Sequence, residues 1–587
     1  AWCWRCARPL QDGMLVASIA LADSSITPQC DADDWEAAAA RVRAIAARAF
    51  DGYAEHAWGQ DELRPVSNRS RDNWGGLAVT MVDSLDTLLL MGLTEHYKRA
   101  RDWLVDNLPA RLGTAVDVPF FEVVIRCLGG LLGAHTLSGD AALLDLAEQL
   151  GDRLLRAFVS PSGLPFCTVN LAHGNASCPR SDFGYSIPLA ELGSVQLEFG
   201  ALAELLDRPE IAVAADGALR ALRRLPSLDG LYPSRLRPHS GGPAAKDVGF
   251  GSGADSFYET LLKRWLQTGG TQPWLLAMHR ESLRGLRSLL RRSHPGGRLF
   301  VARKDFAQHG ALPERLRLRS EQSFEHLSCF VPGWLALGAP YGGEAMNASE
   351  AWGTARELLD TCLALYAASD TGLGPERVSF HTLASREAAR AEARQRAALD
   401  ERAARKRSAR SGHGGGSHGG GAEGWQGGLA ALDLLSEDED YEVLDAQWPL
   451  RPELLESLYI MAALEPEAER ALLYRRRGLA ILEAIEAHCR TATAYSGLRG
   501  DARSGRPRHT DTLESFFLAE TLKYLYLLFA APEALPLDLR AHVLTTEAHI
   551  LPAAPLDAAW DAAAAAEQGE GAEDSKRDQS AHPPWWS

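Results

Sequence analysis

The chain has 587 residues, of which 46% are hydrophobic and 24% are charged, and this composition indicates a folded globular protein with a large core. Its 61 basic and 77 acidic residues give a formal net charge of −16, which argues against a broad cationic surface for nucleic acid or anionic lipid. No run of about 18 uninterrupted apolar residues occurs, so a bilayer-spanning helix is not expected.

Residues 1–34 are expected to be a leader or an incomplete N-terminal region. The chain begins with Ala1, and the apolar stretch 14–22 resembles a weak signal-peptide core, although no basic flank precedes it. Cys3 and Cys6 form a CxxC motif, but no second CxxC or nearby strand-helix pattern supports zinc or thioredoxin chemistry. An unstructured leader is the favoured interpretation.

From about residue 35 onward, apolar residues recur at three-to-four spacing and predict one helix after another, separated by Gly-, Pro- and Ser-rich connections. Several of these helices are apolar on more than one face, as expected for helices between a central axis and an outer layer. The pattern favours an all-α toroid of helical hairpins. The predicted helices span 35–58, 79–93, 121–137, 141–158, 194–206, 255–267, 333–339, 355–368, 452–464, 472–489 and 513–530.

Two segments look foreign to a predicted barrel domain of residues 35–560. Residues 386–428 run from a charged Ala/Arg stretch into Gly/Ser/His repeats, and we expect a solvated, largely disordered insertion. His413 and His418 lie in this insertion, where a flexible Gly linker is favoured over a metal site. Residues 561–587 are expected to form a flexible tail.

Carboxylates are the candidate chemical groups, because no Gly-rich phosphate loop, HExxH motif or nucleophile elbow stands out. Glu122 begins a predicted helix, and Arg126 follows one turn later, so the two side chains can pair. Asp255 begins another helix after the string GFGSGA. Glu453 follows Pro452 in LRPELLES, at the start of a third helix.

Each of these acids alone is more easily explained as a helix N-terminal residue, because the helix dipole and free N–H groups favour carboxylates there. Glu520 is a fourth acid in an apolar helix, four residues after Phe516, which places a carboxylate above an aromatic ring. Four such acids are harder to dismiss. Two carboxyl groups brought together can act as acid and base on a glycosidic bond, one of them with a raised pKa.

A series of long motifs resembles glycoside hydrolase family 47, the class I α-1,2-mannosidases. The resemblance covers about 45 to 552, interrupted mainly by the insertion. So many motifs in the same order make a chance likeness negligible. The motifs are HAWGQDELRP (56–65), TMVDSLDTLLLMGL (80–93), FFEVVIRCLGGLLGAHTLSGD (120–140), SVQLEFGALAELL (194–206), GADSFYETLLKRWLQ (253–267), HLSCFVPGWLALG (326–338), LRPELLES (450–457), ESFFLAETLKYLYLLF (514–529) and TTEAHILP (545–552).

The resemblance implies an (α/α)7 barrel in which a small C-terminal β-hairpin plugs one end. It implies an inverting exo-hydrolase that removes terminal α-1,2-linked mannose from Man9-type N-linked glycans, with one Ca2+ at the base of the barrel. The expected location is the lumen of the endoplasmic reticulum or the Golgi. A membrane anchor is not visible in this chain, and the oligomeric state stays open.

The resemblance also implies residue roles. Glu122 matches the general acid, acting directly or through a water, Asp255 the second acid-side carboxylate, and Glu453 the general base. Thr546 matches the Ca2+ ligand, through its hydroxyl and carbonyl oxygens, and such hard oxygen donors suit Ca2+. Substrate or metal-shell roles fall on Arg126, Glu198, His326, Arg451, Glu456, Phe516, Glu520 and Glu547.

Bland alternatives stay open for some of these positions. Without its motif, His326 is equally well explained as a satisfied core histidine, and Asp83 and Asp86 as residues that brace a helix. Among the nine cysteines, Cys329 and Cys362 match a disulfide of the trimming mannosidases. Cys167 and Cys178 are candidates for a second, shorter loop. An oxidising lumen fits such pairs and the sequons at Asn68, Asn175 and Asn347.

Three departures from the family pattern bear on specificity. Gly253 stands where endoplasmic-reticulum trimming enzymes carry an Arg, which removes a guanidinium fork that contacts glycan branches. Glu325 replaces the usual Asp before HLSCF. Other strings, such as TTEAHILP, resemble the degradation-enhancing branch of the family. The alternative function is therefore a mannosidase or mannose lectin in glycoprotein quality control. A purely non-catalytic module is disfavoured because all three catalytic carboxylates are present.

Overall fold

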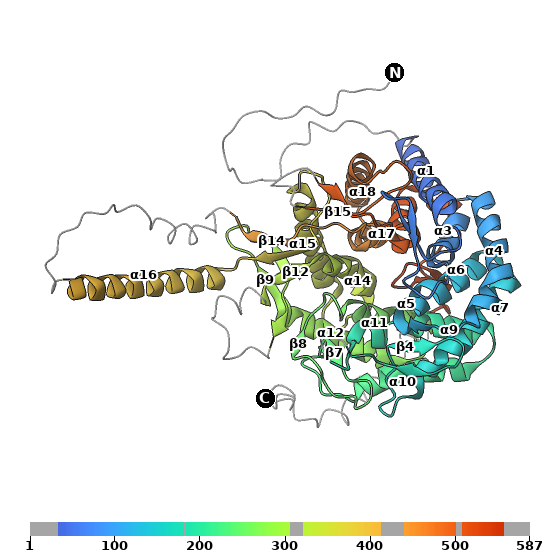
Figure 1. Ribbon diagram of the computed structural model, residues 1–587, viewed down its shortest axis with the longest axis horizontal. Helices are drawn as coiled ribbons and strands as arrows, with labels where there is room; N and C mark the ends of the chain where they lie inside the picture. Colours follow the sequence, from blue (N-terminus) through green and yellow to red (C-terminus); the bar gives the residue numbers. More distant parts are fainter. Residues whose placement is uncertain (1–32, 181–183, 306–320, 412–438, 501–506, 557–587) are drawn as a thin grey trace, which may run out of the picture.

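The helices of the chain close into the expected (α/α)7 barrel (Figure 1). The computed structural model describes residues 33–180, 184–305, 321–411, 439–500 and 507–556. Its α-helices are α1 (Asp33–His56), α2 (Val79–Asp83), α3 (Leu85–Leu90), α4 (Thr94–Leu112), α5 (Phe120–Glu122), α6 (Gly129–Ser138), α7 (Ala141–Leu154), α8 (Leu189–Gly193), α9 (Gln196–Leu205), α10 (Pro209–Arg223), α11 (Asp255–Gln267), α12 (Pro273–Leu289), α14 (Val331–Gly338), α15 (Ala348–Ala367), α16 (Leu383–Ser411), α17 (Glu453–Leu464), α18 (Ala468–His488) and α19 (Leu522–Phe529).

Short helical turns of other pitch join or extend these helices. Two are π-helical, η1 (Val123–Leu128) and η5 (Phe517–Thr521), and both lie in segments that carry predicted site residues. Single π-turns inserted in longer helices are frequent at functional sites. The 3-10 turns are η2 (Leu155–Val159), η3 (His326–Phe330), η4 (Ala339–Tyr341) and η6 (Pro532–Ala534).

Small antiparallel sheets decorate the helical body. The paired strands are β1 (Glu62–Arg64) with β2 (Arg69–Arg71), β3 (Asp117–Pro119) with β4 (Thr168–Asn170) and β5 (Ala176–Ser177), β6 (Ile187–Pro188) with β7 (Arg235–Leu236), β8 (Asp247–Val248) with β11 (Lys304–Asp305), β9 (Leu290–Arg292) with β10 (Leu299–Val301), β12 (Ser323–Glu325) with β13 (Arg377–Phe380) and β14 (Tyr441–Asp445), β15 (Leu498–Arg499) with β16 (Arg508–His509), and β17 (His542–Leu544) with β18 (Ile550–Pro552).

The helix that continues from α5 through η1 into α6 is part of the core. Phe120–Ser138 is long and apolar enough to cross a membrane by length and composition, but 72% of its most apolar window is buried inside the protein. Its apolar residues pack against neighbouring helices on several sides, as the sequence pattern indicated. This buried helix carries Glu122 and Arg126 toward the barrel interior.

The hairpin β17–β18 fills the interior next to α6, α9 and α11. Val543 pairs with Leu551 and Leu544 with Ile550, and all four side chains are buried. The turn between the strands holds Thr546 and Glu547. The hairpin expected at one end of the barrel is therefore present.

Two disulfides lie within the described residues. Cys329 in η3 is bonded to Cys362 in α15, which confirms the pair implied by the family resemblance. Cys167 is bonded to Cys178 and closes the loop through β4 and β5. Cys127 and Cys489 are buried free thiols.

The expected disorder of residues 386–428 is wrong for its first part. Residues up to Ser411 belong to α16, which extends away from the body of the molecule (Figure 1). Ala, Arg and Glu have high intrinsic helix propensity, so this stretch forms a helix without an apolar face to bury. Residues 412–428, residues 561–587 and residues 1–32 lie outside the described residues, while α1 already includes Asp33.

Candidate active site

A cavity of about 880 Å³ opens in the barrel and collects most of the predicted site residues. Helices α5, α8, α11 and α17, the turns η1 and η5, and the turn of the C-terminal hairpin all contribute side chains to it. The predicted residues that line it are Glu122, Arg126, Asp255, Arg451, Glu453, Glu456, Phe516, Glu520, Thr546 and Glu547.

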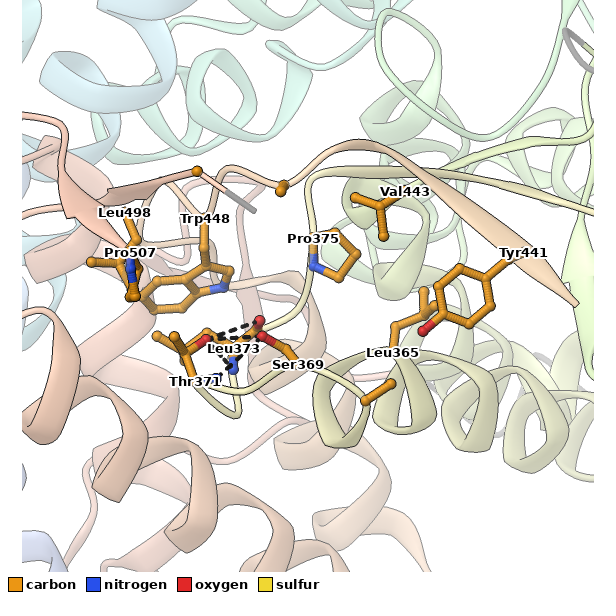
Figure 2. A pocket seen from close by; sticks show the side chains of 13 residues that line it. Leu365, Ser369, Thr371, Leu373, Pro375, Tyr441, Val443, Trp448, Leu498 and Pro507 are labelled. Atoms are coloured by element: carbon orange, nitrogen blue, oxygen red, sulfur yellow. Dashed lines mark hydrogen bonds between the residues drawn. The ribbon is translucent and has the colours of Figure 1, made fainter. Parts of the chain in front are cut away.

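A second cavity, shown in Figure 2, is much smaller, at about 50 Å³. Leu365, Leu373, Pro375, Val443 and Trp448 form much of its lining, and no acidic or basic residue lines it. Its size and chemistry do not suit hydrolysis of a sugar. The larger, carboxylate-lined cavity is therefore the candidate active site.

Glu122 is held by Arg126 at one wall of the cavity. Arg126 Nε donates to Glu122 Oε2 at 2.9 Å, which confirms the pairing expected from their spacing. The same guanidinium pairs with Glu547 from the hairpin turn and lies 3.7 Å from Asp83 Oδ2. Arg126 thus joins the acid to the hairpin that fills the barrel.

The ring of Phe516 lies close to two guanidinium groups. Arg126 and Arg451 stand 5.6 and 5.8 Å from the ring centroid, distances at which cations are attracted to the ring face. The sequence predicts Glu520 above this ring, because Glu520 follows Phe516 by four residues. In the structure Glu520 belongs to the π-helical turn η5, so the angle between the two side chains differs from that in a regular α-helix.

Asp255 begins α11 and faces the cavity. Burial raises the pKa of its carboxyl to about 7, and the negative charges of Glu325 and Glu453 act in the same direction. The backbone N–H of Ser256 donates to Asp255 Oδ1 at 2.9 Å and only partly offsets this shift. Asp255 therefore retains a proton over much of the range below neutral pH.

Glu453 begins α17 and lines the same cavity. Burial by itself raises the pKa of this carboxyl, but the hydrogen bond from His326 and the charge of Arg451 outweigh it, so the pKa lies below its ordinary value. His326 Nδ1 is 2.9 Å from Glu453 Oε2. Arg451 lies 3.8 Å from Oε1 and is itself held by Glu376. Glu453 is therefore ionised at neutral pH.

Further carboxylates crowd the floor of the cavity. Burial raises the pKa of Glu520 and of Glu547 well above the ordinary value, and their mutual repulsion raises that of Glu520 further. Burial also raises the pKa of Glu456 to about 8, although Lys263 Nζ lies 3.1 Å from its Oε1. Lys263 pairs with Glu259 as well. Such a group of buried acids favours protons or a cation nearby.

The hairpin is fixed by a buried network of charges. His549 Nε2 is 3.1 Å from Asp83 Oδ1, and His549 Nδ1 is 3.2 Å from Asp86 Oδ2. Lys523 Nζ donates to Asp86 Oδ2 at 2.8 Å and to the carbonyl of Ala548 at 2.7 Å. Asp83 and Asp86 thus brace the hairpin that carries Thr546, which is more than the helix bracing inferred from sequence.

Glycines of α6 make room for this network. A Cβ at Gly129 would lie 2.5 Å from the His549 ring, and one at Gly133 would lie 2.9 Å from Asp86 Oδ2. The string LGGLLGA therefore has small residues where the hairpin approaches the helix.

Two predicted site residues lie behind the cavity wall. His326 reaches the site through Glu453. Glu198 in α9 is fully buried, and burial raises its pKa to about 8. Within the part of the chain that the structure describes, neither of its carboxylate oxygens has a hydrogen-bond partner. Their roles toward substrate or metal stay predictions.

Two of the departures from the family pattern, Gly253 and Glu325, line the cavity. Gly253 has φ +86°, a conformation that favours glycine, and it lines the cavity beside Ser252. The long carboxylate of Glu325 accepts a hydrogen bond from the Ser252 N–H at 2.6 Å. A Cβ at Gly251 would lie 2.5 Å from that carboxylate, so the glycine accommodates the extra methylene of Glu325.

Sequence reasoning missed several residues of the site. Glu191 lines the cavity, and burial together with the charge of Glu122 raises its pKa to about 7. Lys263 and Glu259 have i, i+4 spacing in α11, which resembles an ordinary exposed pair. Tyr366 and Trp448 stand behind His326. None of these has a local sequence signal that separates it from core packing.

The arrangement can act as an acid and a base. Asp255 has a raised pKa, Glu453 a lowered one, and both face one cavity. Environments that push two carboxyl pKa values apart assign acid and base roles at neutral pH. Glycoside hydrolysis requires such a pair on either side of the scissile bond.

Comparisons with known proteins agree with this geometry. The chain is 33% identical to mannosyl-oligosaccharide 1,2-alpha-mannosidase MNS3 of Arabidopsis thaliana, with 88% of this chain and 79% of the relative covered. It is 35% identical to the human endoplasmic reticulum mannosyl-oligosaccharide 1,2-alpha-mannosidase, with 86% of this chain and 62% of the relative covered. It is 33% identical to mannosyl-oligosaccharide alpha-1,2-mannosidase IA of Drosophila melanogaster, with 87% and 67% covered.

The fold is similar to that of the solved alpha-1,2-mannosidase from Trichoderma reesei, with a TM-score of 0.71 at 24% identity over 88% of this chain and 99% of that one. The family described as Glycosyl hydrolase family 47 matches residues 45–553. This match extends over the barrel, the carboxylate-lined cavity and the hairpin that fills it, and the chain belongs to glycosyl hydrolase family 47.

Proposed function

We propose that the chain is an inverting exo-α-1,2-mannosidase that trims terminal α-1,2-linked mannose from Man9-type N-linked glycans. The observation that carries the proposal is the pair formed by Asp255 and Glu453, which face one cavity with pKa values shifted in opposite directions. The named activity of the relatives supports the substrate.

Glu122, assisted by Asp255, supplies the proton to the glycosidic oxygen, directly or through a water. Glu453 accepts a proton from the water that attacks the anomeric carbon from the opposite face. The bond between that carbon and the leaving oxygen breaks as the new bond forms, so the released mannose has inverted configuration. Arg126 and Arg451, which both lie close to the Phe516 ring, donate hydrogen bonds to sugar hydroxyls.

The residues at the floor of the cavity fit the Ca2+ that the family implies. The hairpin turn offers the hydroxyl and carbonyl oxygens of Thr546, and the buried carboxylates of Glu520 and Glu547 supply negative charge close by. No cluster of three or more His, Cys, Asp or Glu with ligand geometry occurs within the described ranges, so waters complete such a coordination shell. A bound Ca2+ there supplies a fixed positive charge that orients mannose hydroxyls.

The same proposal places the protein in the secretory pathway, in the endoplasmic reticulum or the Golgi, where its substrates are glycoproteins with high-mannose N-glycans. Two disulfides among the described residues support an oxidising compartment. A relative named as an endoplasmic-reticulum enzyme and a relative named mannosidase IA match the chain about equally well.

Isosteric amides at the catalytic carboxyls test the proposal. Glu453→Gln and Glu122→Gln should each lower kcat on a Man9 N-glycan by about 10²- to 10⁴-fold, because proton transfer is lost, while glycan binding is retained. Glu344→Gln, on an exposed loop, is the matched control and should have no effect. Turnover at the normal rate in both active-site variants would refute these roles, and binding without turnover in the unaltered protein would favour a lectin.

A further inference from the structure

We propose that Tyr366 and Trp448 are positioning residues that fix the tautomer of His326 and so hold Glu453 in the orientation of a general base. The inference rests on the proposed function, in which Glu453 activates the attacking water. Three hydrogen bonds join these four residues in a line: Trp448 Nε1 to Tyr366 Oη at 2.9 Å, Tyr366 Oη to His326 Nε2 at 2.7 Å, and His326 Nδ1 to Glu453 Oε2 at 2.9 Å.

The direction of the line follows from its first member. An indole N–H is a donor only, so Trp448 must donate to the hydroxyl oxygen of Tyr366. The hydroxyl has one proton, which then points to Nε2 of His326. With Nε2 an acceptor, the ring proton of neutral His326 is on Nδ1, and it points to the carboxylate of Glu453.

The neutral ring is the form in which each member of the line has a partner along it. A ring that donated from both nitrogens would make the hydroxyl of Tyr366 accept from His326 and from Trp448 at once, and the hydroxyl proton would then have no acceptor along this line.

Burial makes the line rigid and shields it from water. His326 is 3% exposed, Tyr366 4% and Trp448 2%. Hydrogen bonds in such surroundings are strong, and their loss is costly. The line therefore transmits orientation from Trp448 to the carboxylate.

Other contacts hold Tyr366 and Trp448 in place, independently of the side-chain hydrogen bonds of the line. The Tyr366 ring fits against Gly374, where a Cβ would lie 2.4 Å from it. The backbone of Trp448 pairs with Leu498 through two hydrogen bonds of 2.9 Å. Figure 2 shows the indole beside Leu498 and Pro507 at the wall of the small cavity. The donor at the start of the line is thus held in place.

The consequence for Glu453 is an asymmetric carboxylate. Oε2 accepts the His326 proton, while Oε1 faces Arg451 at 3.8 Å, too far for a hydrogen bond, and is available to a water. Asp255 from α11 and Glu520 from η5 are further charged groups that act on Glu453. Both are acids, so the donor from His326 is a main reason why the base stays ionised.

A spectrum of the unaltered protein tests the tautomer without reference to activity. Histidine side chains labelled with ¹⁵N should show His326 Nε2 as a pyridine-like nitrogen and Nδ1 as a pyrrole-like nitrogen near neutral pH. The His326→Gln variant identifies its signals by their absence. A pyrrole-like Nε2, or an imidazolium, would overturn the proposal even if the protein is a mannosidase.

Variants test the effect on the base. Tyr366→Phe keeps the ring but removes the hydroxyl, and we expect kcat to fall about 10- to 100-fold with KM within about twofold. The acidic limb of the pH profile should move to higher pH, because a weakened bond from His326 lets the pKa of Glu453 rise. Tyr474→Phe removes a buried hydroxyl that is bonded to Glu465, away from the cavity, and is the control that should leave kcat unchanged.

The double variant Tyr366→Phe with Trp448→Phe separates positioning from stability. The single variant Tyr366→Phe leaves the indole N–H of Trp448 without its acceptor, which should lower the melting temperature. The double variant removes this N–H, so part of that decrease in melting temperature should be reversed. The proposal requires kcat to stay low in the double variant. If kcat recovers together with stability, or if folded Tyr366→Phe has the kcat and acidic limb of the unaltered enzyme, the positioning role is refuted while the mannosidase activity stands.

Discussion

Asp255 and Glu453 differ in pKa because their neighbours differ. Asp255 is buried among other acids and receives one backbone hydrogen bond, whereas Glu453 receives a proton donor from His326 and the charge of Arg451. Glu122, the proposed general acid, is instead anchored by Arg126. The chemistry therefore depends on single residues whose environments come from distant parts of the chain.

The pKa of Asp255 sets the alkaline limit of activity if its protonated form is required. A carboxyl with a pKa of about 7 loses its proton as the pH rises through 7, so kcat/KM should be level below that pH and fall above it. Activity should persist on the acidic side until Glu453 is protonated, below its ordinary pKa. Initial rates on a Man9 glycan across pH measure both limbs.

Glu325→Gln tests whether the pKa of Asp255 sets the alkaline limit of activity. The amide oxygen can still accept the hydrogen bond from Ser252, but the negative charge that raises the pKa of Asp255 is gone. The pKa should fall, and the alkaline limb should move to lower pH by less than about one unit. Glu344→Gln is the exposed control. If the alkaline limb of the pH profile does not move, a group other than Asp255 sets it.

At the scale of elements, the C-terminal hairpin is the part of the fold that the site depends on most. It brings Thr546 and Glu547 into the cavity, and Asp83, Asp86 and Lys523 hold it through His549 and a backbone carbonyl. Glycines of α6 permit the close approach. The turn between the two short strands holds Thr546 and Glu547 in fixed positions, because the charged groups around His549 are buried and paired.

His549→Ala should lower the free energy of unfolding by about 3–5 kcal/mol, because the buried Asp83 and Asp86 each lose one of their charged partners. Burial disfavours charged His549, but Asp86 and Asp83 raise its pKa from 6.5 to about 9. A raised folded-state pKa gives stability that is complete below 6.5 and lost as the pH rises through about 9. The difference between variant and parent should therefore shrink at alkaline pH.

Denaturant titrations at neutral and alkaline pH measure this difference. His542→Ala, on the same hairpin but near the surface, is the matched control and should cost less than about 1 kcal/mol. Equal losses for the two histidines would contradict the buried-network account.

Helix α16 is the element that the site should not need. It extends from the body, and its first turn is tied down by Arg386, which donates to the carbonyls of His294 and Glu439. Replacing residues 392–436 by a short Gly/Ser linker should leave kcat/KM on a Man9 glycan within about twofold, since loop closure depends weakly on length. A large loss of activity would show that this segment contributes to substrate binding.

At the scale of the whole molecule, the sequence could predict the barrel and many of the residues that line its cavity, but few of the contacts between them. Regular apolar spacing indicated the helices, and the Glu122–Arg126 pair followed from its four-residue spacing. The resemblance to the family motifs pointed to Glu453 as the candidate general base. The line through Tyr366 and Trp448 joins residues 82 positions apart, which no local pattern encodes. The helix α16 was missed because its polar composition resembles that of a disordered segment.

Removal of Ca2+ should destabilise the whole barrel as well as stop turnover. A ligand that binds only the folded state stabilises it by about 2.7 kcal/mol at a hundredfold excess over Kd, so a chelator should lower the melting temperature. Thr546→Ala should reduce the rise in melting temperature on adding Ca2+, whereas Thr114→Ala, at an exposed turn, should not. A melting curve indifferent to Ca2+ and chelator would contradict a cation site in the hairpin turn.

The most direct test of the central claim follows the products formed from a Man9 N-glycan by the purified protein, with Ca2+ or with excess chelator. Mass spectrometry counts the hexoses lost, and proton NMR at early times identifies the anomer released. The account predicts Ca2+-dependent release of β-mannose. The number of hexoses removed also reports on branch selectivity, because Gly253 lines the cavity at the position where endoplasmic-reticulum trimming enzymes carry an Arg. Release of α-mannose would contradict the inverting mechanism, and glycan binding with no hexose released would contradict the mannosidase itself.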